Sequence, residues 1–349
     1  MRSDGRAVET ERQGARALRE WITGERRDYA RVFLLEPGAA TENVEGVAGP
    51  DDAVLLPVEC GAYDGQGAAI RYSGILSDAG DELFIGDRGV ELQDYVAAAF
   101  VQIVGPTAVS MVDETGWQAF LADADLARRT GVFPSALLDP RVLLADRSAL
   151  TNPTELVTPS AIRVHRDGAI GLGIGGEVVG RVDDLPTLLA TPVARSASLA
   201  GAVPADVLAS DLAAREWVGR YLLATDLMKM LRLANGAATI SGFGGAFFED
   251  HLADAEPLTA DPFLIETADV FVLADTTTLR RRLLSRPTAM VVAATQTSST
   301  LEVAAERTAR QLGVSASEAR NLCREALTAL DVHLGRRTGA SYRADGVEQ

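Results

Sequence analysis

Two copies of one helix-start signature, Ser-x-x-Glu, stand in the last quarter of this 349-residue chain. They begin at Ser299 and Ser315, and each directly precedes an apolar run with helical spacing. In such a capping box the serine hydroxyl accepts a hydrogen bond from a free backbone N–H, and the glutamate reaches back to the first residue. Three strand-like runs and one further helix precede them after Asp261. This order predicts a small winged helix-turn-helix unit, a type of unit that binds DNA or a peptide.

Charge is distributed unevenly along the chain. The formal net charge is -16, yet basic and acidic residues balance from Asp261 onward, so the acidity lies in residues 1–260. This distribution disfavours non-specific binding to nucleic acid or to an anionic membrane. No apolar run reaches the roughly 18 residues that a membrane span needs, and the N-terminus lacks the apolar segment of a secretory signal. Cys60 and Cys323 form no Cys-x-x-Cys pair, which suits a reducing compartment. We therefore expect a cytoplasmic protein with no membrane partner.

Hydrophobic periodicity predicts the α+β class, because short apolar runs of strand type alternate with amphipathic helices. The N-terminal domain reads as α/β or α+β, and a glycine-rich β-hairpin turns at Asp167-Gly168 within residues 160–183. Pro204–Gly236 predicts one long helix or two shorter ones. The expected parts are an N-terminal mixed domain (1–200), a helical connector (201–256), a winged helix-turn-helix with three strands and three helices (257–337) and a flexible tail (338–349).

Short apolar runs and one entry helix describe the N-terminal domain further. The entry helix is expected within residues 8–28, and a second helix is expected at Trp117–Arg128. The runs of strand type are Arg31–Leu35, Ala53–Val58, Ala69–Leu76, Glu82–Ile85, Phe100–Val104 and Val109–Val112. Their order in a sheet does not follow from the sequence pattern.

The segment Gly171-Leu-Gly-Ile-Gly-Gly176 formally matches the Gly-x-Gly-x-x-Gly fingerprint of dinucleotide sites. That fingerprint needs a strand before the glycines and a helix after them, whereas Glu177–Arg181 is of strand type. The glycines therefore favour a twisted hairpin or a bulge, and no cofactor is expected.

Histidines and carboxylates, which often form metal or catalytic sites in proteins, are scattered along this chain. His165, His251 and His333 lie far apart in sequence and predict no metal site. Carboxylates at Asp113-Glu114 and nearby Asp123 and Asp125 are typical of a solvated acidic face. No nucleophile elbow or phosphate-binding loop occurs. We predict no catalytic residue and no metal ligand, and we expect that the protein is not an enzyme.

Two sets of side chains in the C-terminal unit carry the binding hypothesis. In the run Thr278–Leu284, alternation places Leu279, Arg281 and Leu283 on one face and Arg280 and Arg282 on the other. Such arginines protect an edge strand from aggregation or attract an acidic guest strand. On the third helix, Arg320, Arg324 and Thr328 follow one another at i, i+4 spacing. This ridge is either a solvated face or a binding face.

Residues 261–335 resemble the RiPP recognition element, the peptide-binding unit shared with the peptide chaperone of pyrroloquinoline quinone biosynthesis. The resemblance rests on the order of three strands and three helices, on Pro287-Thr-Ala-Met-Val-Val, on Thr297-Ser-Ser, and on the stretch from Leu301-Glu-Val-Ala-Ala through Gly313-Val314. The chain departs from the family at Ser285-Arg-Pro, where a more acidic entry is common, and at Thr297, where glycine is common.

Residues 1–260 are similar to the recognition proteins of daptide biosynthesis in segments such as Gly86–Tyr95 and Gly105–Ala108. Those proteins are non-catalytic partners that carry such a recognition unit. The resemblance implies a precursor leader peptide as ligand. It also implies modifying enzymes as partners, which oxidatively decarboxylate, transaminate and methylate a C-terminal residue.

The first functional hypothesis is therefore a scaffold whose edge strand and third helix bind a leader peptide by strand addition. Leu279 or Leu283 would anchor an apolar leader residue, and Arg280, Arg282, Arg320 and Arg324 would attract its carboxylates. The alternative is a transcription regulator whose third helix enters the major groove, which the neutral charge of the unit disfavours. A further alternative is an enzyme whose site is assembled from scattered carboxylates in residues 1–260.

Overall fold

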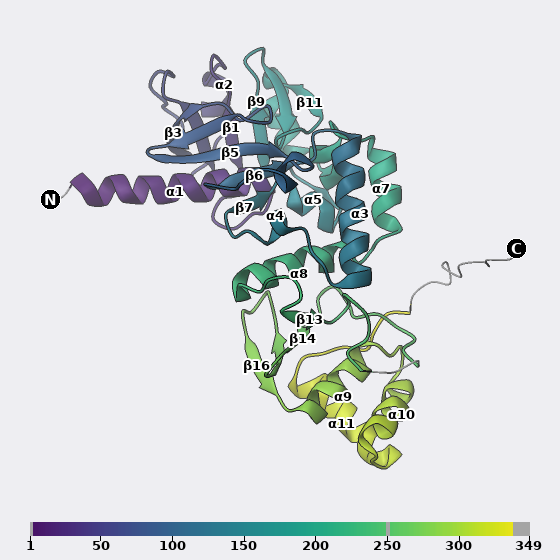
Figure 1. Cartoon of the computed structure of the whole chain (residues 1–349). Helices are drawn as coiled ribbons and strands as arrows, with labels where there is room; N and C mark the ends of the chain where they lie inside the picture. Colours follow the sequence, from purple (N-terminus) through teal and green to yellow (C-terminus); the bar gives the residue numbers. More distant parts are fainter. Residues whose placement is uncertain (1–2, 249–251, 338–349) are drawn as a thin grey trace, which may run out of the picture. The chain divides into compact units, whose positions relative to one another are not determined.

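The computed structural model describes residues 3–248 and 252–337, and its architecture is mixed α+β, as expected from the sequence (Figure 1). Internal contacts divide the chain into two compact units. Unit 1 comprises Met1–Asp123 and Pro134–Val218, and unit 2 comprises Ala124–Phe133 and Gly219–Gln349. The connector expected at 201–256 is thus shared between the units, while the tail expected at 338–349 lies outside the described residues.

Unit 1 is built on one mixed sheet. Its strands are β1 (Val32–Leu35), β2 (Ala53–Pro57), β3 (Ala68–Gly74), β4 (Glu82–Ile85), β5 (Arg88–Asp94), β6 (Thr107–Ser110), β7 (Val142–Leu144), β9 (Ala161–Val164), β10 (Ala169–Leu172) and β11 (Val178–Arg181). They lie in the order β11-β10-β9-β1-β2-β3-β4-β5-β6-β7. Pairing is parallel from β9 through β3 and from β5 through β7, and antiparallel elsewhere. A separate pair joins β8 (Leu156–Val157) and β12 (Val193–Ala194).

Helices cover both faces of this sheet. Those of unit 1 are α1 (Ser3–Thr23), α2 (Glu42–Glu45), η1 (Ala97–Ala99), α4 (Ser135–Leu138), α5 (Arg147–Thr151), η2 (Val182–Asp184), α6 (Leu185–Ala190), η3 (Arg195–Leu199) and α7 (Ala205–Ala213). The helix α3 (Glu114–Thr130) begins in unit 1 and ends in unit 2.

Burial on both faces explains why the central strands read as uninterrupted apolar runs. Along β1, Val32 packs into the core under α1, and its neighbour Phe33 packs into the core under α2 and α6. The α1 helix contributes the fully buried Trp21, whose indole Nε1 donates to the Ile162 carbonyl of β9 at 3.1 Å. The charged entry helix is therefore held to the sheet by its C-terminal half, from Gly14 onward.

The structure corrects one predicted strand and supports the predicted hairpin. Residues 100–104 form a loop, in which Phe100 is 84% exposed, because the sheet passes directly from β5 to β6. The turn at Asp167-Gly168 joins β9 to β10, which pair antiparallel. At the glycine-rich segment, β11 then pairs antiparallel with β10, with a register shift at Ile170/Gly171. A Cβ on Gly176 would lie 1.9 Å from the Leu172 carbonyl oxygen, so the connection between β10 and β11 requires glycine at this position. A strand rather than a helix follows the glycines, as the hairpin interpretation expects.

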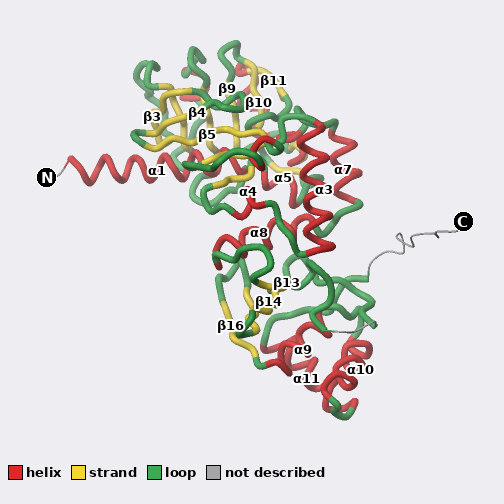
Figure 2. The backbone as a smooth tube through the Cα atoms, in the orientation of Figure 1, coloured by secondary structure: helices red, strands yellow, loops and turns green. Residues whose placement is uncertain are grey.

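In its described residues, unit 2 combines an antiparallel sheet with the end of α3 and four further helices (Figure 2). Its strands are β13 (Ala238–Ile240), β14 (Phe263–Thr267), β15 (Phe271–Ala274) and β16 (Arg281–Leu284), which lie in that order. Its helices are α8 (Val218–Leu231), α9 (Arg286–Gln296), α10 (Leu301–Leu312) and α11 (Ala316–Ala329). The predicted order of three strands and three helices is present. The prediction missed β13, a fourth strand, because this short segment lies far from the others in sequence.

Capping side chains define where the last three helices begin. Ser285 caps α9 and Ser315 caps α11, and the hydroxyl of Ser315 accepts from the Glu318 N–H at 3.2 Å. The α10 helix corrects the sequence prediction by one residue, because Thr300 rather than Ser299 is its N-cap. Ser299 is instead bonded through its backbone and its hydroxyl to Asp254. Gly313 ends α10 with φ of 67°, a conformation that favours glycine.

We expect Ser315→Ala to lower the free energy of unfolding by about 1 kcal/mol, because it removes the N-cap of α11. Urea unfolding of the full chain, followed by circular dichroism, measures this change. Ser315→Asn is the control, since asparagine caps helices about as well as serine. Equal destabilisation by both substitutions would show that the cap hydrogen bond is not what stabilises α11.

Candidate functional site

The β16 strand forms one edge of the sheet in unit 2, since β15 is its single strand partner among the described residues. The register pairs Leu273 with Arg282 and Val272 with Leu283. The Asp275 N–H donates to the Arg280 carbonyl at 2.9 Å, which sets the alternation of hydrogen-bonded residues along the pair. By that alternation the backbone groups of Arg281 and Leu283 face away from β15. An incoming strand can pair with these groups.

Alternation along β16 places the side chains of Arg282 and Leu283 on opposite faces of the sheet. Arg282 lies on the face of the buried Leu273, whereas Leu283 lies on the opposite face and is 75% exposed. Leu279 precedes the strand in a turn, with φ of 57°, and is 65% exposed. Both leucines that the sequence offered as anchors are therefore accessible.

A hydrogen-bonded turn leads into β16. Asp275 accepts from the backbone N–H of Thr277 at 2.7 Å and from the hydroxyl of Thr278 at 2.6 Å. Burial opposes ionisation of this carboxyl, but the bonds from Thr278 and Thr277 outweigh it and lower the pKa of Asp275. The turn therefore keeps a charged carboxylate that holds the entry to the strand.

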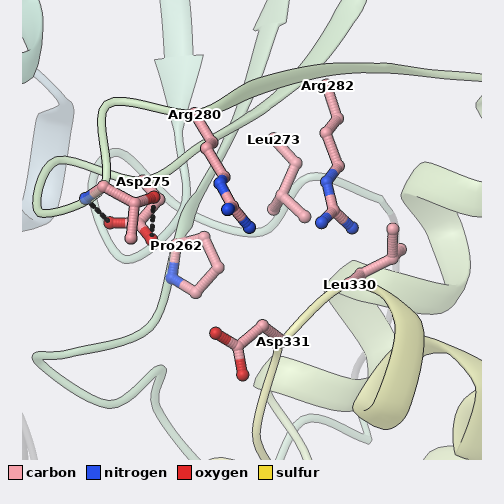
Figure 3. A pocket seen from close by; sticks show the side chains of 8 residues that line it. Pro262, Leu273, Asp275, Arg280, Arg282, Leu330 and Asp331 are labelled. Atoms are coloured by element: carbon pink, nitrogen blue, oxygen red, sulfur yellow. Dashed lines mark hydrogen bonds between the residues drawn. The ribbon is translucent and has the colours of Figure 1, made fainter.

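A small cavity of about 50 Å³ lies between β16 and the end of α11. Figure 3 shows that the side chains of Arg280 and Arg282 extend towards the same space, with Asp331 across from them. Arg282 donates to the Ala329 carbonyl at the C-terminus of α11, where a cation is favoured. Arg280 makes no side-chain hydrogen bond within the described ranges and remains available to a ligand. The cavity is lined by Pro262, Leu273, Asp275, Thr278, Arg280, Arg282, Leu330 and Asp331.

A buried polar network positions the cavity wall. The Asp261 carboxylate accepts from the backbone N–H of His333 at 3.1 Å and lies 2.7 Å from its Nδ1. From α8, the buried Arg220 donates to the Asp261 and Leu258 carbonyls at 2.9 and 2.7 Å, and its guanidinium lies 4.0 Å from the ring of Phe263. Burial lowers the pKa of Arg220 to about 10, so it stays charged. The network ties the segment before β14 to the segment after α11, which provide Pro262 and Asp331.

The helix residues of the predicted site lie apart from this cavity. On α11, Arg320 forms an ion pair with Glu302 of α10, and the hydroxyl of Thr328 donates to the Arg324 carbonyl at 3.0 Å. Arg324 is exposed. The structure thus brings Arg280 and Arg282 together, while Arg320, Arg324 and Thr328 do not line the cavity. Sequence reasoning missed Asp331 and Pro262; the end of helical periodicity near Leu330 was the available signal for Asp331.

The scattered carboxylates of the sequence have structural partners. Asp113 accepts from the Gly116 N–H at 2.9 Å at the start of α3. Asp123 accepts from the Tyr95 hydroxyl at 2.9 Å, and burial raises the pKa of its carboxyl. Across residues 3–248 and 252–337, no group of three or more His, Cys, Asp and Glu is arranged to hold a metal ion. These carboxylates form no assembled site.

Comparisons with protein-family models, with curated proteins and with solved structures found no match to this chain. A search of the described residues for a membrane-spanning helix also found none with the needed length and apolar character. The features that bear on function are therefore the edge strand β16, its arginines and the cavity beside α11.

Proposed function

We propose that unit 2 is a winged helix-turn-helix recognition unit that binds the leader segment of a ribosomally made precursor peptide. The leader adds as a strand to β16, so its main chain pairs with the outward groups of Arg281 and Leu283. An acidic leader side chain enters the cavity and meets Arg280 and Arg282. The observation that supports this most is that β16, which has no strand on its outer side among the described residues, lies directly beside a cavity lined by two arginines.

The proposed role is that of a non-catalytic cytoplasmic scaffold. Unit 1 would dock the modifying enzyme, which raises the effective concentration of the peptide core at that enzyme's active site. In a daptide-like pathway this enzyme would be an oxidative decarboxylase. The competing role of DNA binding is disfavoured by Arg320, the first cation of the helical ridge, because Glu302 already neutralises it.

The test uses short precursor peptides encoded beside this gene, labelled with fluorescein at the N-terminus. Anisotropy is measured against the full chain and, in parallel, with labelled DNA from upstream of the gene. We expect saturable binding of a peptide and no saturable binding of DNA. Salt-dependent DNA binding without peptide binding would overturn the proposal.

Strand addition makes a specific prediction for Leu283→Pro. Proline removes an outward N–H and blocks an incoming strand, yet it leaves the bonds between β15 and β16 in place. We expect at least about a tenfold loss of peptide affinity, as two or more main-chain hydrogen bonds are lost. Leu283→Ala is the control, since it retains the N–H. If both variants lose affinity equally, the side chain of Leu283 rather than strand addition provides the binding.

A further inference from the structure

A second cavity lies wholly within unit 1, at the N-terminal ends of the strands β1 and β9. Its volume is about 90 Å³. Several parts of the chain meet there, namely the loops before β1 and before β9, the end of β8, the end of β10, the start of α5 and the segment from β12 into η3. It is lined by Gly24, Arg26, Asp146, Ser148, Val157, Pro159, Ser160, Ala161, Leu172, Val193, Ala194, Arg195 and Ser198.

Two guanidinium groups, those of Arg26 and Arg195, line this cavity. Arg26 is exposed and donates to the carbonyl and the hydroxyl of Thr158, the latter at 3.3 Å. It has no ion-pair partner in the described part of the chain, whereas Arg195 pairs with Glu155 at 2.8 Å. Arg26 thus adds a positive charge that no carboxylate in the described ranges pairs with, in the part of the chain that carries the formal charge of -16.

Hydroxyl groups line the cavity between the arginines. The side chains of Ser148 and Ser160 form no hydrogen bond within the described ranges, although both line the cavity. The hydroxyl of Ser198 donates to the Arg195 carbonyl at 3.2 Å. The hydroxyls of Ser148 and Ser160 and the guanidinium of Arg26 can therefore donate hydrogen bonds to a bound oxyanion.

Asp146 forms the buried end of the cavity. Its side chain is almost fully buried, and its Oδ1 has no hydrogen-bond partner among the residues that the structure describes. A Cβ on Gly173 would lie 2.0 Å from this oxygen, so the glycine-rich segment leaves the space that the carboxyl occupies. The glycine-rich turn after β10, which matches the dinucleotide fingerprint only formally, therefore shapes this wall.

We propose that this cavity binds the phosphate group of a small molecule. Arg26 and Arg195 provide charge at the opening, and Ser148 and Ser160 provide hydroxyl donors from other directions. Donors that converge from several sides suit a tetrahedral phosphate better than a planar carboxylate. A space of about 90 Å³ holds one such group, while the rest of the ligand would extend through the opening.

The ionisation of nearby groups is consistent with an anion at this place. Burial, then the charges of Arg195 and Arg31, lower the pKa of Arg26, so a bound anion would relieve an existing repulsion. Burial also raises the pKa of Asp146 to about 8, so its carboxyl is mostly protonated at neutral pH and does not repel a phosphate.

Calorimetric titration of the full chain tests the proposal, with inorganic phosphate, adenosine monophosphate and citrate as probes in a chloride buffer. We expect saturable binding of at least one phosphate probe and weaker or no binding of citrate. Arg26→Gln and Arg195→Gln should each weaken phosphate binding at least about tenfold, because each removes a charge-assisted hydrogen bond.

Arg27→Gln is the matched control, since Arg27 is exposed next to Arg26 but pairs with Glu25 and does not line the cavity. It should change the affinity less than about twofold. Tighter binding of the nucleotide than of inorganic phosphate would identify a phosphomonoester ligand, and the reverse would identify free phosphate; both support the proposal. No saturable binding of either phosphate probe, equal binding of citrate, or equal loss in Arg27→Gln would overturn it.

Discussion

Replacing both Arg280 and Arg282 with glutamate will weaken the binding of an acidic leader peptide at least about 100-fold, since two charge-assisted hydrogen bonds become two repulsions. The two guanidinium groups extend towards one cavity that already contains Asp275 and Asp331. Reversal would leave four carboxylates around that space. Anisotropy with the labelled precursor peptide measures the loss. The affinity of the native chain should also fall as salt is added, since screening weakens exposed charge pairs.

Arg281→Glu is the matched control for this charge reversal. Arg281 lies between the two arginines in sequence, but alternation places its side chain on the other face of β16. We expect it to change the affinity by less than about threefold, because the substitution keeps the backbone groups of Arg281 and its exposed side chain lies outside the cavity. A loss as large as that of the double variant would mean that general charge attraction, rather than the cavity, recruits the peptide. Circular dichroism establishes that each variant is folded.

Local sequence signals predicted much of unit 2 because its elements are short-range. The run Phe263–Thr267 is a strand over the predicted residues, and alternation along β16 correctly separated Arg282 from Leu283. The cap of α10 was misplaced by one residue because Ser299 and Thr300 are both good N-caps. Their choice depends on Asp254, which bonds Ser299 from a distant part of the chain.

The cavity beside α11 could not be predicted in the same way. Pro262 and Asp331 face the arginines only because Asp261, Arg220 and His333 join three segments that are far apart in sequence. Buried side-chain networks of this kind leave no periodic signal. The sequence therefore indicated the arginines of the site and left its acidic wall undetected.

In unit 1, the strands could be predicted from the sequence better than their order in the sheet. Most of its strands were visible as apolar runs, but their spatial order passes from β11 to β7 through eight intervening strands, which no local pattern encodes. The run Phe100–Val104 has the composition of a strand and is a loop, because β5 already occupies the position beside β6. The composition of an apolar run does not show whether a neighbouring strand is available to pair with it.

Asp146→Asn should stabilise the protein at alkaline pH and have little effect at acid pH. Burial raises the pKa of Asp146 to about 8, against the opposing effects of the Ser198 hydroxyl, the Ile174 N–H and the charge of Arg163. The folded state therefore binds a proton that the unfolded state releases at lower pH, near its ordinary value of 3.8. The stabilisation from this proton is complete below that value, and it is lost as pH rises through about 8.

Thermal unfolding of the full chain between pH 5 and pH 9 in phosphate-free buffer measures this effect. Native stability should fall relative to that of Asp146→Asn by up to about 1.4 kcal/mol per pH unit between pH 5 and about 8, and the difference should level off above that pH. The comparison with the variant removes the contribution of other buried carboxyls such as Asp123, which both proteins share. Asp87→Asn, in an exposed turn, is the control and should leave the pH dependence of the native chain unchanged. Parallel pH profiles for native protein and Asp146→Asn would mean that the Asp146 carboxyl is ionised in the folded state, and the cavity would then lose its neutral wall.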